Sequence, residues 1–591
     1  MKCAGIAWDL HPGEDYLPFL RSVWESVNNL YTLLYYMSRI ADDLARSAHQ
    51  SGVHAQLDGS AEPMLPLRSA AGKMPEIAIV GAGVAGLRCA DTLLKAGAKV
   101  TIFEARNRVG GRVHQRESGG HLMDMGANWI HGTNKNPISK LAEQTCTTVI
   151  EPGEENLLFD TDGKKLSDEV SKDLSSRMWG MIVDAFKYSD EHSSAIQPKT
   201  SLYDYFKDRL SKEVNDDQRR RDALNECRMW GPFIGDPIER QSLKFFFLEE
   251  CIDGENVFVA STYQSILDTI SKAALSADIV RFNEEVTSIN YFCSSIEVIT
   301  STQHSENFDE VIITSPLGYL KSYHKTLFSP RLPARLDAAI RNIYYGRLEK
   351  VYVTFEKAWW LTDSSNTTSF PIFTHFHPPT SHPLFSPGTD LRDWNQSVMS
   401  LTHLPGPNSH PTLLFYIYGT CASHVVDAIK SLKPHSKEYD DALIAVFQPF
   451  YSKLPHYSPD SPDCIPASML ATTWQADRLA GYGSYSNFQV GLERADEDIE
   501  VMRDAGGLTD KGIWLAGEHT APFIALGTTT GAWWSGEAVA RRIATKWGLK
   551  VSDEEGVLKN ADTLANGHGG NLKKELSKDE VEGAQANAIA L

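Results

Sequence analysis

Residues 76–104 read EIAIVGAGVAGLRCADTLLKAGAKVTIFE, and this stretch decides the fold class. Ile77 to Val80 form a short run rich in β-formers, Leu87 to Ala96 read as a helix, and Lys99 to Phe103 form a second strand-like run. Strand, helix and strand follow one another at the spacing of a βαβ unit. The stretch therefore predicts a parallel sheet and an α/β fold.

The turn between the first strand and the helix carries three glycines in the spacing GxGxxG, at Gly81, Gly83 and Gly86. The first permits a sharp turn, the second lets a pyrophosphate approach the backbone, and the third lets helix and strand pack closely. The helix N-terminus directs free N–H groups toward the phosphates. Glu104 follows about 20 residues later, where a ribose-binding acid is expected, and an acid there favours FAD or NAD over NADP. We therefore predict an adenine-dinucleotide site.

The residues after Glu104 distinguish FAD from NAD. They continue ARNRVGGRV, and the GGR turn at Gly110 to Arg112 resembles the second phosphate-binding turn of glutathione-reductase-like flavoproteins, specifically the flavin amine oxidase superfamily. The resemblance implies FAD, with Arg112 beside its pyrophosphate and Arg106 and Gly111 as further contacts. A solvated surface charge is the alternative for Arg112.

The stretch DMGANWIHGTNKNPISKLAEQ, residues 124–144, resembles the segment that passes under the flavin ring in polyamine oxidases. Its WIHG sequence is similar to that of animal polyamine and spermine oxidases. The resemblance implies that Asn128 and Trp129 contact the cofactor and that His131 faces the substrate channel. We expect His131 to orient the amine or adjust its protonation, although a lone histidine is more often structural.

Residues 311–360 resemble the family block in which a lysine begins a strand after a short turn containing glycine, and Lys350 matches that lysine. In relatives it holds a water at flavin N5, which makes Lys350 the second catalytic candidate. A lysine in the apolar pattern of Val351, Val353 and Phe355 is costly to bury without a partner. The alternative is a lysine at a strand edge that extends its amine into water.

Two C-terminal stretches complete the resemblance. Trp474 and the following GSYS sequence imply a tryptophan against the flavin ring and an aromatic substrate wall at Tyr485. We expect Trp533 or Trp534 to contribute to the same wall. The GEHT motif in residues 512–544 places Glu518 where the family binds the ribitol of FAD.

The helix that begins near Thr528 is expected to direct its N-terminal amides at the flavin pyrimidine, where negative charge accumulates on reduction. Thr528 and Thr529 are therefore predicted cofactor contacts, together with Val286 from an interior strand.

The chain departs from the family pattern at three positions. Thr530 stands where relatives often have a histidine, Thr528 where some have an aromatic residue, and Leu348 where some have a tyrosine. The aromatic cage around an amine is thus incomplete, so polyamine specificity is a weaker inference than amine oxidation.

The match covers roughly residues 75 to 546, with cofactor motifs at both ends. It implies a glutathione-reductase-like FAD-binding Rossmann domain, interleaved with an α+β substrate domain of the amine oxidase type. We assign 75–130, 251–330 and 466–548 to the FAD-binding domain and 131–250 and 331–465 to the substrate domain. Outside them, the sequence predicts an amphipathic helical extension at 1–50, a linker at 51–74 and a disordered tail at 549–591.

The composition of the chain limits the classes of ligand and partner that it is expected to bind. The chain has 57 Lys and Arg against 76 Asp and Glu, a net charge of −19, which disfavours nucleic acid and favours cationic solutes. Its 8 cysteines show no CxxC pair or Cys/His cluster, so we expect reduced thiols and no metal.

Without a signal-like or membrane-spanning stretch, a cytoplasmic location with no membrane association is expected. The helix at 1–50 is a candidate for self-association or partner contact.

The sequence thus predicts an FAD-dependent oxidase of a small cationic, polyamine-like amine. Hydride transfer to flavin N5 and reoxidation by O2 are expected to give an imine or aldehyde, a released amine and hydrogen peroxide. One alternative is an oxidase of an amino acid or a specialised-metabolite amine, with Arg228 or Arg240 binding a carboxylate. Another is a flavoprotein that binds a ligand or partner without turnover.

A run of acidic residues has two interpretations: it either guides a cation or forms a solvated loop. Its members are Glu249, Glu250, Asp253 and Glu255.

Overall fold

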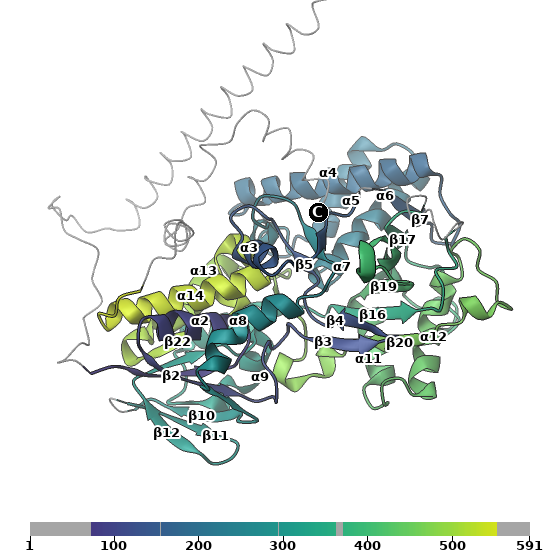
Figure 1. The fold of residues 1–591 in the computed structure, drawn as a ribbon. Helices are drawn as coiled ribbons and strands as arrows, with labels where there is room; N and C mark the ends of the chain where they lie inside the picture. Colours follow the sequence, from purple (N-terminus) through teal and green to yellow (C-terminus); the bar gives the residue numbers. More distant parts are fainter. Residues whose placement is uncertain (1–72, 154, 293–294, 362–369, 552–591) are drawn as a thin grey trace, which may run out of the picture. The chain divides into compact units, whose positions relative to one another are not determined.

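The computed structural model describes residues 73–153, 155–292, 295–361 and 370–551. The predicted helix at 1–50, the linker up to residue 72 and the tail from residue 552 lie outside the described residues. Figure 1 shows the described part as two sheet-containing halves with helices around them. The predicted α/β architecture is confirmed.

The first half is built on a parallel sheet with the strand order β22-β13-β1-β2-β9. Its strands come from three separate segments of the chain: β1 (Glu76–Val80), β2 (Lys99–Glu104), β9 (Val280–Phe282), β13 (Glu310–Ile313) and β22 (Ile513–Leu515). Such parallel strands are joined by helical crossovers that cover the sheet.

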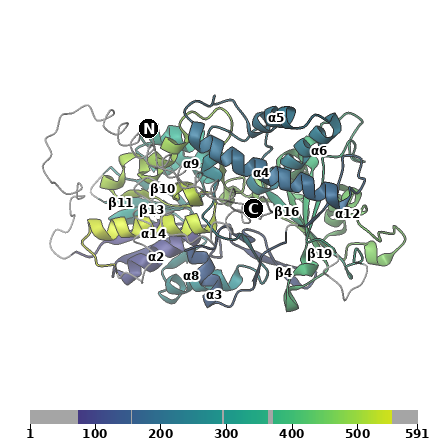
Figure 2. The same cartoon turned by 90° about the horizontal axis from the view of Figure 1, so that it is seen from above.

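One face of this sheet packs against three helices, α2 (Val84–Lys95), α8 (Gln264–Ser276) and α14 (Thr529–Lys546). Alternate residues of β1, Ile77 and Ile79, point to these helices, because successive side chains of a strand point to opposite faces. Figure 2 shows α2 and α14 side by side, although they lie more than 400 residues apart in sequence. The C-terminal helix thus completes the layer that the first βαβ unit begins.

The other face packs against a four-stranded sheet and three helices in one apolar cluster. These elements are β10 (Val286–Asn290), β11 (Ile296–Thr300), β12 (Ser305–Phe308), β14 (Phe328–Ser329), α9 (Leu317–Leu327), α10 (Ala334–Asn342) and α13 (Ala495–Arg503). Both faces of the parallel sheet are therefore covered.

The second half is built on a sheet with the order β20-β16-β19-β18-β17-β7. Its strands are β7 (Asn156–Phe159), β16 (Glu349–Thr354), β17 (Phe373–Phe376), β18 (Gln396–Ser400), β19 (Thr412–Ile417) and β20 (Ser468–Ala471). One face packs against α11 (Gly419–Ile429) and α12 (Lys437–Tyr451), and the other carries Tyr352, Leu414 and Tyr416.

The domain boundaries predicted at residues 331 and 466 each differ from the structure in one element. Helix α10 follows residue 331 but packs in the apolar cluster of the parallel sheet. Strand β20 pairs with β16, Val351 opposite Ala471, and so lies in the second sheet. Hydrogen bonding to β16 decides its place, and this pairing is invisible in the local sequence because it joins residues more than 100 positions apart.

A helical layer lies over the β7 end of the second sheet (Figure 1). It contains α4 (Asp168–His192), α5 (Leu202–Glu213), α6 (Asp217–Cys227) and α7 (Gly231–Ile234). The first three begin at side-chain caps, with Ser167, Ser201 and Asp216 each accepting a hydrogen bond from a first-turn amide. The remaining short elements are β3 (Gln115–Ser118), β4 (His121–Asp124), β5 (Trp129–Ile130), α3 (Pro137–Gln144), β6 (Val149–Ile150), β8 (Val257–Val259), β15 (Tyr344–Tyr345) and β21 (Ser486–Asn487).

The close contact between β1 and α2 requires glycine at position 86. A Cβ there would lie 2.1 Å from the carbonyl oxygen of Gly81. We expect Gly86→Ala to lower the free energy of unfolding by about 1–3 kcal/mol, the usual cost of overpacking, with a matching drop in Tm. The control is Gly180→Ala in the exposed middle of α4, where a Cβ meets nothing within 4 Å and gains about 0.5–1 kcal/mol in helix preference. A Gly86→Ala protein as stable as the wild type would contradict this packing.

Candidate active site

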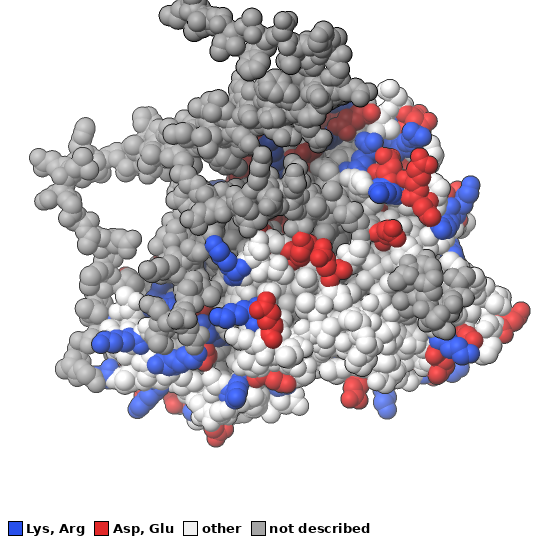
Figure 3. All heavy atoms as spheres, turned by 45° about the horizontal axis from the view of Figure 1, so that its top comes forward, with Lys and Arg blue, Asp and Glu red and all other residues white. Residues whose placement is uncertain are grey.

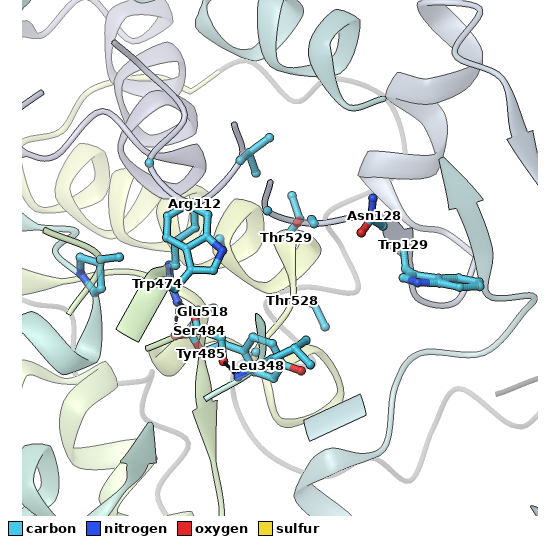
Figure 4. A pocket seen from close by; sticks show the side chains of 18 of the residues that line it. Arg112, Asn128, Trp129, Leu348, Trp474, Ser484, Tyr485, Glu518, Thr528 and Thr529 are labelled. Carbon is cyan, nitrogen blue, oxygen red and sulfur yellow. Dashed lines mark hydrogen bonds and ion pairs between the residues drawn. The ribbon is translucent and has the colours of Figure 1, made fainter. Parts of the chain in front are cut away.

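A single cavity of about 430 Å³ joins the C-terminal end of β1 to the open face of the second sheet. Figure 4 shows Arg112, Trp474 and Glu518 on one side of it and Asn128 and Trp129 on the other. The structure brings nearly all predicted site residues to this cavity: Gly81, Gly83, Glu104, Arg106, Gly111, Arg112, Asn128, Trp129, His131, Val286, Lys350, Trp474, Tyr485, Glu518, Thr528 and Thr529.

Three residues named in the predictions do not line the cavity. Gly86 lies behind it, in the contact between α2 and β1 that its predicted packing role requires. Trp533 or Trp534 was predicted for the substrate wall, and that prediction is wrong, since neither lines the cavity. The ring of Trp533 lies 4.3 Å from the guanidinium carbon of Arg88, between α14 and α2, because α14 turns this residue toward its neighbouring helix. No local pattern distinguishes the two faces of a helix that is buried on both.

The glycine turn leaves room for a phosphate group. A Cβ at Gly83 would meet nothing within 4 Å, in contrast to the crowded Gly81 and Gly86. No side chain caps the N-terminus of α2, which begins at Val84 without an acid in its first turn. The first-turn amides therefore remain available to an anion, as a pyrophosphate requires.

Two acidic residues line the end of the cavity near the glycine turn, where the adenosine of a dinucleotide would lie, and they have different partners. Glu104 accepts hydrogen bonds from the amides of Ala82 and Arg106, both at 2.8 Å, so it also fastens the glycine turn. Glu284, which the sequence analysis did not single out, lines the same end, and its buried Oε2 has no hydrogen-bond partner among the described residues. A buried acceptor without a partner is costly, and a ribose hydroxyl would satisfy it. Arg106 donates to both oxygens of Asp477 at 2.9 Å.

Arg112 and Glu518 form an ion pair in the middle of the cavity wall, in which Glu518 is buried and Arg112 is partly exposed. Arg112 Nη1 donates to Ser484 O at 2.6 Å and to Glu518 Oε1 at 3.1 Å. Burial alone would raise the pKa of Glu518, but Arg112 and the hydroxyl of Ser486, 2.6 Å away, hold that pKa below its ordinary value. Glu518 is thus an ionised acceptor facing the cavity. The solvated alternative for Arg112 is wrong.

Lys350 lies on β16, between two neighbouring strands, and only 4% of it is exposed. Its Nζ donates to Asp124 O at 2.5 Å, Gly126 O at 2.6 Å and Asn128 Oδ1 at 2.5 Å. Burial lowers the pKa of Lys350, and the buried carboxyl of Asp124 opposes that shift. The alternative of a strand-edge lysine reaching into water is therefore wrong.

His131 is held in one orientation by Asn256. Asn256 Oδ1 accepts from Gly132 N at 3.1 Å and lies 3.2 Å from His131 Nδ1. Because an amide oxygen only accepts, Nδ1 carries the hydrogen and Nε2 is the unprotonated nitrogen. Burial lowers the pKa of His131, so the ring is neutral near pH 7 and can accept a proton.

The second sheet contributes a row of four side chains, of which the sequence analysis predicted Lys350 and missed the other three. Lys350 lies opposite Tyr416, Tyr416 opposite Ser397, and Ser397 opposite His375. Directly opposed residues point to the same face, and all four line the cavity. The signal was too weak to find them, since a polar residue in an otherwise apolar strand does not reveal its cross-strand neighbours.

The rest of the substrate side is mainly aromatic. Trp474 donates from Nε1 to Met125 O at 3.0 Å, and Tyr485 donates to Phe233 O. Leu348 and Thr528, where relatives can carry aromatic residues, both line the cavity (Figure 4). Additional aromatic lining comes from Trp179, Phe186, Trp230, Phe233 and Phe373.

Neither arginine considered for binding a substrate carboxylate lines the cavity. Arg228 pairs with Glu239 at 2.6 Å, and Arg240 donates to Gln489 at 2.7 Å. Of the acidic run, Glu249 lines the cavity and Glu250, Asp253 and Glu255 do not. Burial raises the pKa of Glu249 to about 7.

In the part of the chain that the structure describes, no group of His, Cys, Asp and Glu could hold a metal ion. The six cysteines there form no disulfide: Cys89, Cys146, Cys227, Cys251, Cys421 and Cys464. Among the same residues, no helix combines the length and apolar character needed to cross a membrane.

The empty space at Gly83 gives a test that separates cofactor binding from folding. Gly83 has φ −77° and ψ 178°, so alanine fits its backbone without strain. We expect Gly83→Ala to leave the Tm of the apoprotein unchanged but to weaken FAD binding by about tenfold or more, because the methyl group takes up space needed by the pyrophosphate. Titration of apoprotein with FAD, followed by flavin fluorescence, measures this. Equal affinities for both proteins would contradict the assigned turn.

The chain was compared with families and proteins of known description. Residues 84–544 match the family described as flavin containing amine oxidoreductase. A probable polyamine oxidase 4 of Arabidopsis thaliana is 30% identical over 330 residues, which cover 52% of this chain and 65% of that protein. The chain thus spans about two thirds of the length of this relative. The human peroxisomal N(1)-acetyl-spermine/spermidine oxidase is 27% identical over 520 residues, covering 81% of this chain and 96% of that protein.

A solved structure supports the fold. Wild-type putrescine oxidase bound to putrescine superposes with a TM-score of 0.57 at 17% sequence identity, covering 80% of this chain and 99% of that one. The predicted resemblance to flavin amine oxidases is confirmed, and the cofactor is FAD. With the family match extending over most of the described residues, the chain belongs to the flavin-containing amine oxidoreductases.

Proposed function

We propose that this chain is an FAD-dependent oxidase of small cationic, polyamine-like amines. The observation that carries the proposal is the continuity of one cavity, from the glycine turn after β1 to the row of side chains that begins at Lys350. A ligand in this cavity can contact the dinucleotide site at one end and the second sheet at the other. The similarity to polyamine and spermine/spermidine oxidases supports the substrate class.

The residues present fit FAD. The amides at the start of α2 and the guanidinium of Arg112 would hold its pyrophosphate, and Glu518 would accept from its ribitol hydroxyls. The N-terminus of α14, at Thr528 and Thr529, would stabilise negative charge. When bound, FAD supplies the oxidation by taking a hydride from the carbon next to the amine nitrogen, and O2 reoxidises it with release of hydrogen peroxide.

The first task of the chain's own residues in the proposed reaction is to remove a proton from the substrate amine. An alkylammonium must lose its proton before its carbon can give up a hydride, and Nε2 of neutral His131 is an acceptor for that proton. The imine product then hydrolyses to an aldehyde and a smaller amine.

The walls determine which amines enter. Aromatic faces such as Trp179, Trp230 and Phe233 attract cations and pack against methylene groups. The net charge of −19 raises the concentration of cations near the protein. On the face shown in Figure 3, both acidic and basic side chains of the described residues are visible.

An oxidase of amino acids is the second candidate. The placement of Arg228 and Arg240 disfavours it, since neither lines the cavity, and the cavity arginines Arg106 and Arg112 are paired with acids on the cofactor side. A flavoprotein without turnover would have no need for the buried amine of Lys350 beside the cofactor site.

The deciding experiment is an amine panel on the holoenzyme. Hydrogen peroxide release is measured with spermine, N-acetylspermidine, simple monoamines and amino acids. We expect release with the polyamines and little with amino acids. Peroxide from amino acids alone would favour the second candidate, and no peroxide with any substrate would favour a non-catalytic flavoprotein.

Lys350 is the second residue that the proposal places at the reacting end. Lys350→Met should slow kcat about hundredfold or more, because it removes the ammonium that organises Asp124, Gly126 and Asn128 at the cofactor face. The flavin absorbance should remain, since no predicted phosphate contact is lost. Lys357→Met, which removes an exposed lysine close by in sequence, is the matched control. An unchanged kcat in Lys350→Met would eliminate the role.

His131→Gln should lower kcat/KM about hundredfold at pH 7, the usual scale for loss of a general base. The pKa of His131 lies below its ordinary value, so the wild-type ring is neutral and active there. The defect should shrink as the pH approaches about 10, where free alkylamines lose their own proton. Steady-state rates across this pH range test the idea, and a defect of constant size would argue against proton transfer to His131.

A further inference from the structure

A buried carboxyl group that the proposed reaction does not use lies next to Lys350 on β16. This group belongs to Glu349, which is only 1% exposed and does not line the cavity. Successive side chains of a strand point to opposite faces, so Glu349 points away from the face that carries Lys350. Any effect of Glu349 on the active site therefore passes through the residues that it contacts.

The carboxylate of Glu349 holds the start of the loop that carries Trp474. Its Oε1 accepts from the amide of Gln475 at 2.8 Å, and its Oε2 accepts from the amide of Trp474 at 3.0 Å. These are the first two amides of a short 3-10 helix, Trp474–Ala476, to which the preceding residue, Thr473, provides no side-chain cap. The amides at a helix start need an acceptor, and Glu349 supplies it from 125 positions away along the chain.

Trp474 is thus held at both of its ends. Its amide donates to Glu349, while its indole Nε1 donates to the carbonyl of Met125 at 3.0 Å. Between these contacts the ring lines the cavity on the same side as Arg112 and Glu518, where the cofactor would lie (Figure 4). Without the contact to Glu349, the indole nitrogen alone would hold the ring in place.

The same carboxylate is connected to Lys350 through one hydroxyl group. Thr472 Oγ1 donates to Glu349 Oε2 and accepts from the backbone amide of Lys350 at 2.8 Å. The amide of Thr472 donates to the carbonyl of Lys350 at 2.9 Å, which continues the pairing of β16 with β20 beyond Ala471. Glu349 therefore links the two side chains that the second half directs at the cofactor site, Trp474 and Lys350.

The chemistry of the three contacts requires a carboxylate. Two amides and one hydroxyl donate to its two oxygens, and an ionised carboxylate accepts at both. Burial raises the pKa of Glu349 to about 7, although the three donors oppose that shift. A glutamine in its place would have one acceptor oxygen, and its NH2 group would face a donor. Glu349→Gln therefore changes the hydrogen bonding without changing the size of the side chain.

We propose that Glu349 is a positioning residue for the amine oxidation, which holds Trp474 and Lys350 in one geometry at the flavin. It acts through the amide of Trp474 and the hydroxyl of Thr472. A displacement of about 1 Å near the reacting atoms can slow a reaction about hundredfold. The assignment rests on the proposed amine oxidation and adds to it a residue outside the cavity on which the rate depends.

The test compares Glu349→Gln with the wild-type holoenzyme at about pH 8, where the carboxylate of the wild type is mostly ionised. The visible absorbance of the bound flavin is recorded without substrate, and the rate of flavin reduction by spermine is measured without O2. We expect the variant to show shifted flavin absorbance and a rate of reduction lowered about tenfold to hundredfold, with little change in KM. Its affinity for FAD should remain, because the predicted phosphate contacts are untouched.

Thr472 gives an independent test of the same link. Thr472→Val keeps the size of the side chain but removes the hydroxyl, so it should lower the rate of flavin reduction about tenfold. Thr472→Ser keeps the hydroxyl and should restore most of the wild-type rate. If Glu349→Gln fails to hold FAD, this pair decides, since wild-type rates in both Thr472 variants would overturn the proposal.

The matched control is Glu310→Gln, which changes a second buried carboxylate that accepts from tryptophans. Glu310 accepts from Trp514 Nε1 at 2.7 Å and from Trp547 Nε1 at 2.8 Å, and it does not line the cavity. This control should have a lower Tm but an unchanged flavin absorbance and rate of reduction.

A Glu349→Gln protein that behaves like the control would show a merely structural role and overturn the proposal. If amine oxidation is active in the wild type and unchanged in Glu349→Gln, the oxidase function stands and the positioning role fails. A change in flavin absorbance confined to Glu349→Gln, in a protein that oxidises no amine, would support the placement of Trp474 by Glu349 and refute the oxidase function.

Discussion

The buried ammonium of Lys350 is the contact on which the active site depends. It extends from the second sheet and donates to three oxygens of the segment that leaves the dinucleotide fold, at Asp124, Gly126 and Asn128. A charge this deeply buried is stable only when its hydrogen bonds are satisfied, so the two halves of the molecule are held in one relative position at this point. The cavity runs along both sides of that contact.

The cavity changes character along its length. Near the glycine turn it offers backbone amides and paired charges, which suit a cofactor with phosphates. In its middle, Lys350 donates to three oxygens of the segment from Asp124 to Asn128, and His131 is a base whose pKa burial lowers, which favours its uncharged form. At the β17 end, the buried carboxyl of Glu226 lies 2.9 Å from His375 Nδ1 and 3.2 Å from His377 Nε2.

The sequence predicted most of the cofactor side, because glycine turns and helix termini act through neighbouring residues. Gly81, Gly83 and Gly86 serve one turn, and their spacing is visible in a few letters. Trp533 and β20 were misplaced because their neighbours, Arg88 and β16, lie far away in sequence. His375 and Glu226 were missed for the same reason, since about 150 residues separate them and neither belongs to a recognisable motif.

By itself the sequence determined the βαβ unit and its dinucleotide turn, because these follow from local steric and hydrogen-bonding requirements, whereas the family and FAD were identified by the resemblance of its motifs. The tertiary structure alone decided which side chains share the cavity and how far apart they lie. Strand register set the row from Lys350 to His375, and packing of α6 beneath β17 brought Glu226 to its histidines. Register and packing are long-range, because they depend on pairings between segments whose partners no local pattern identifies.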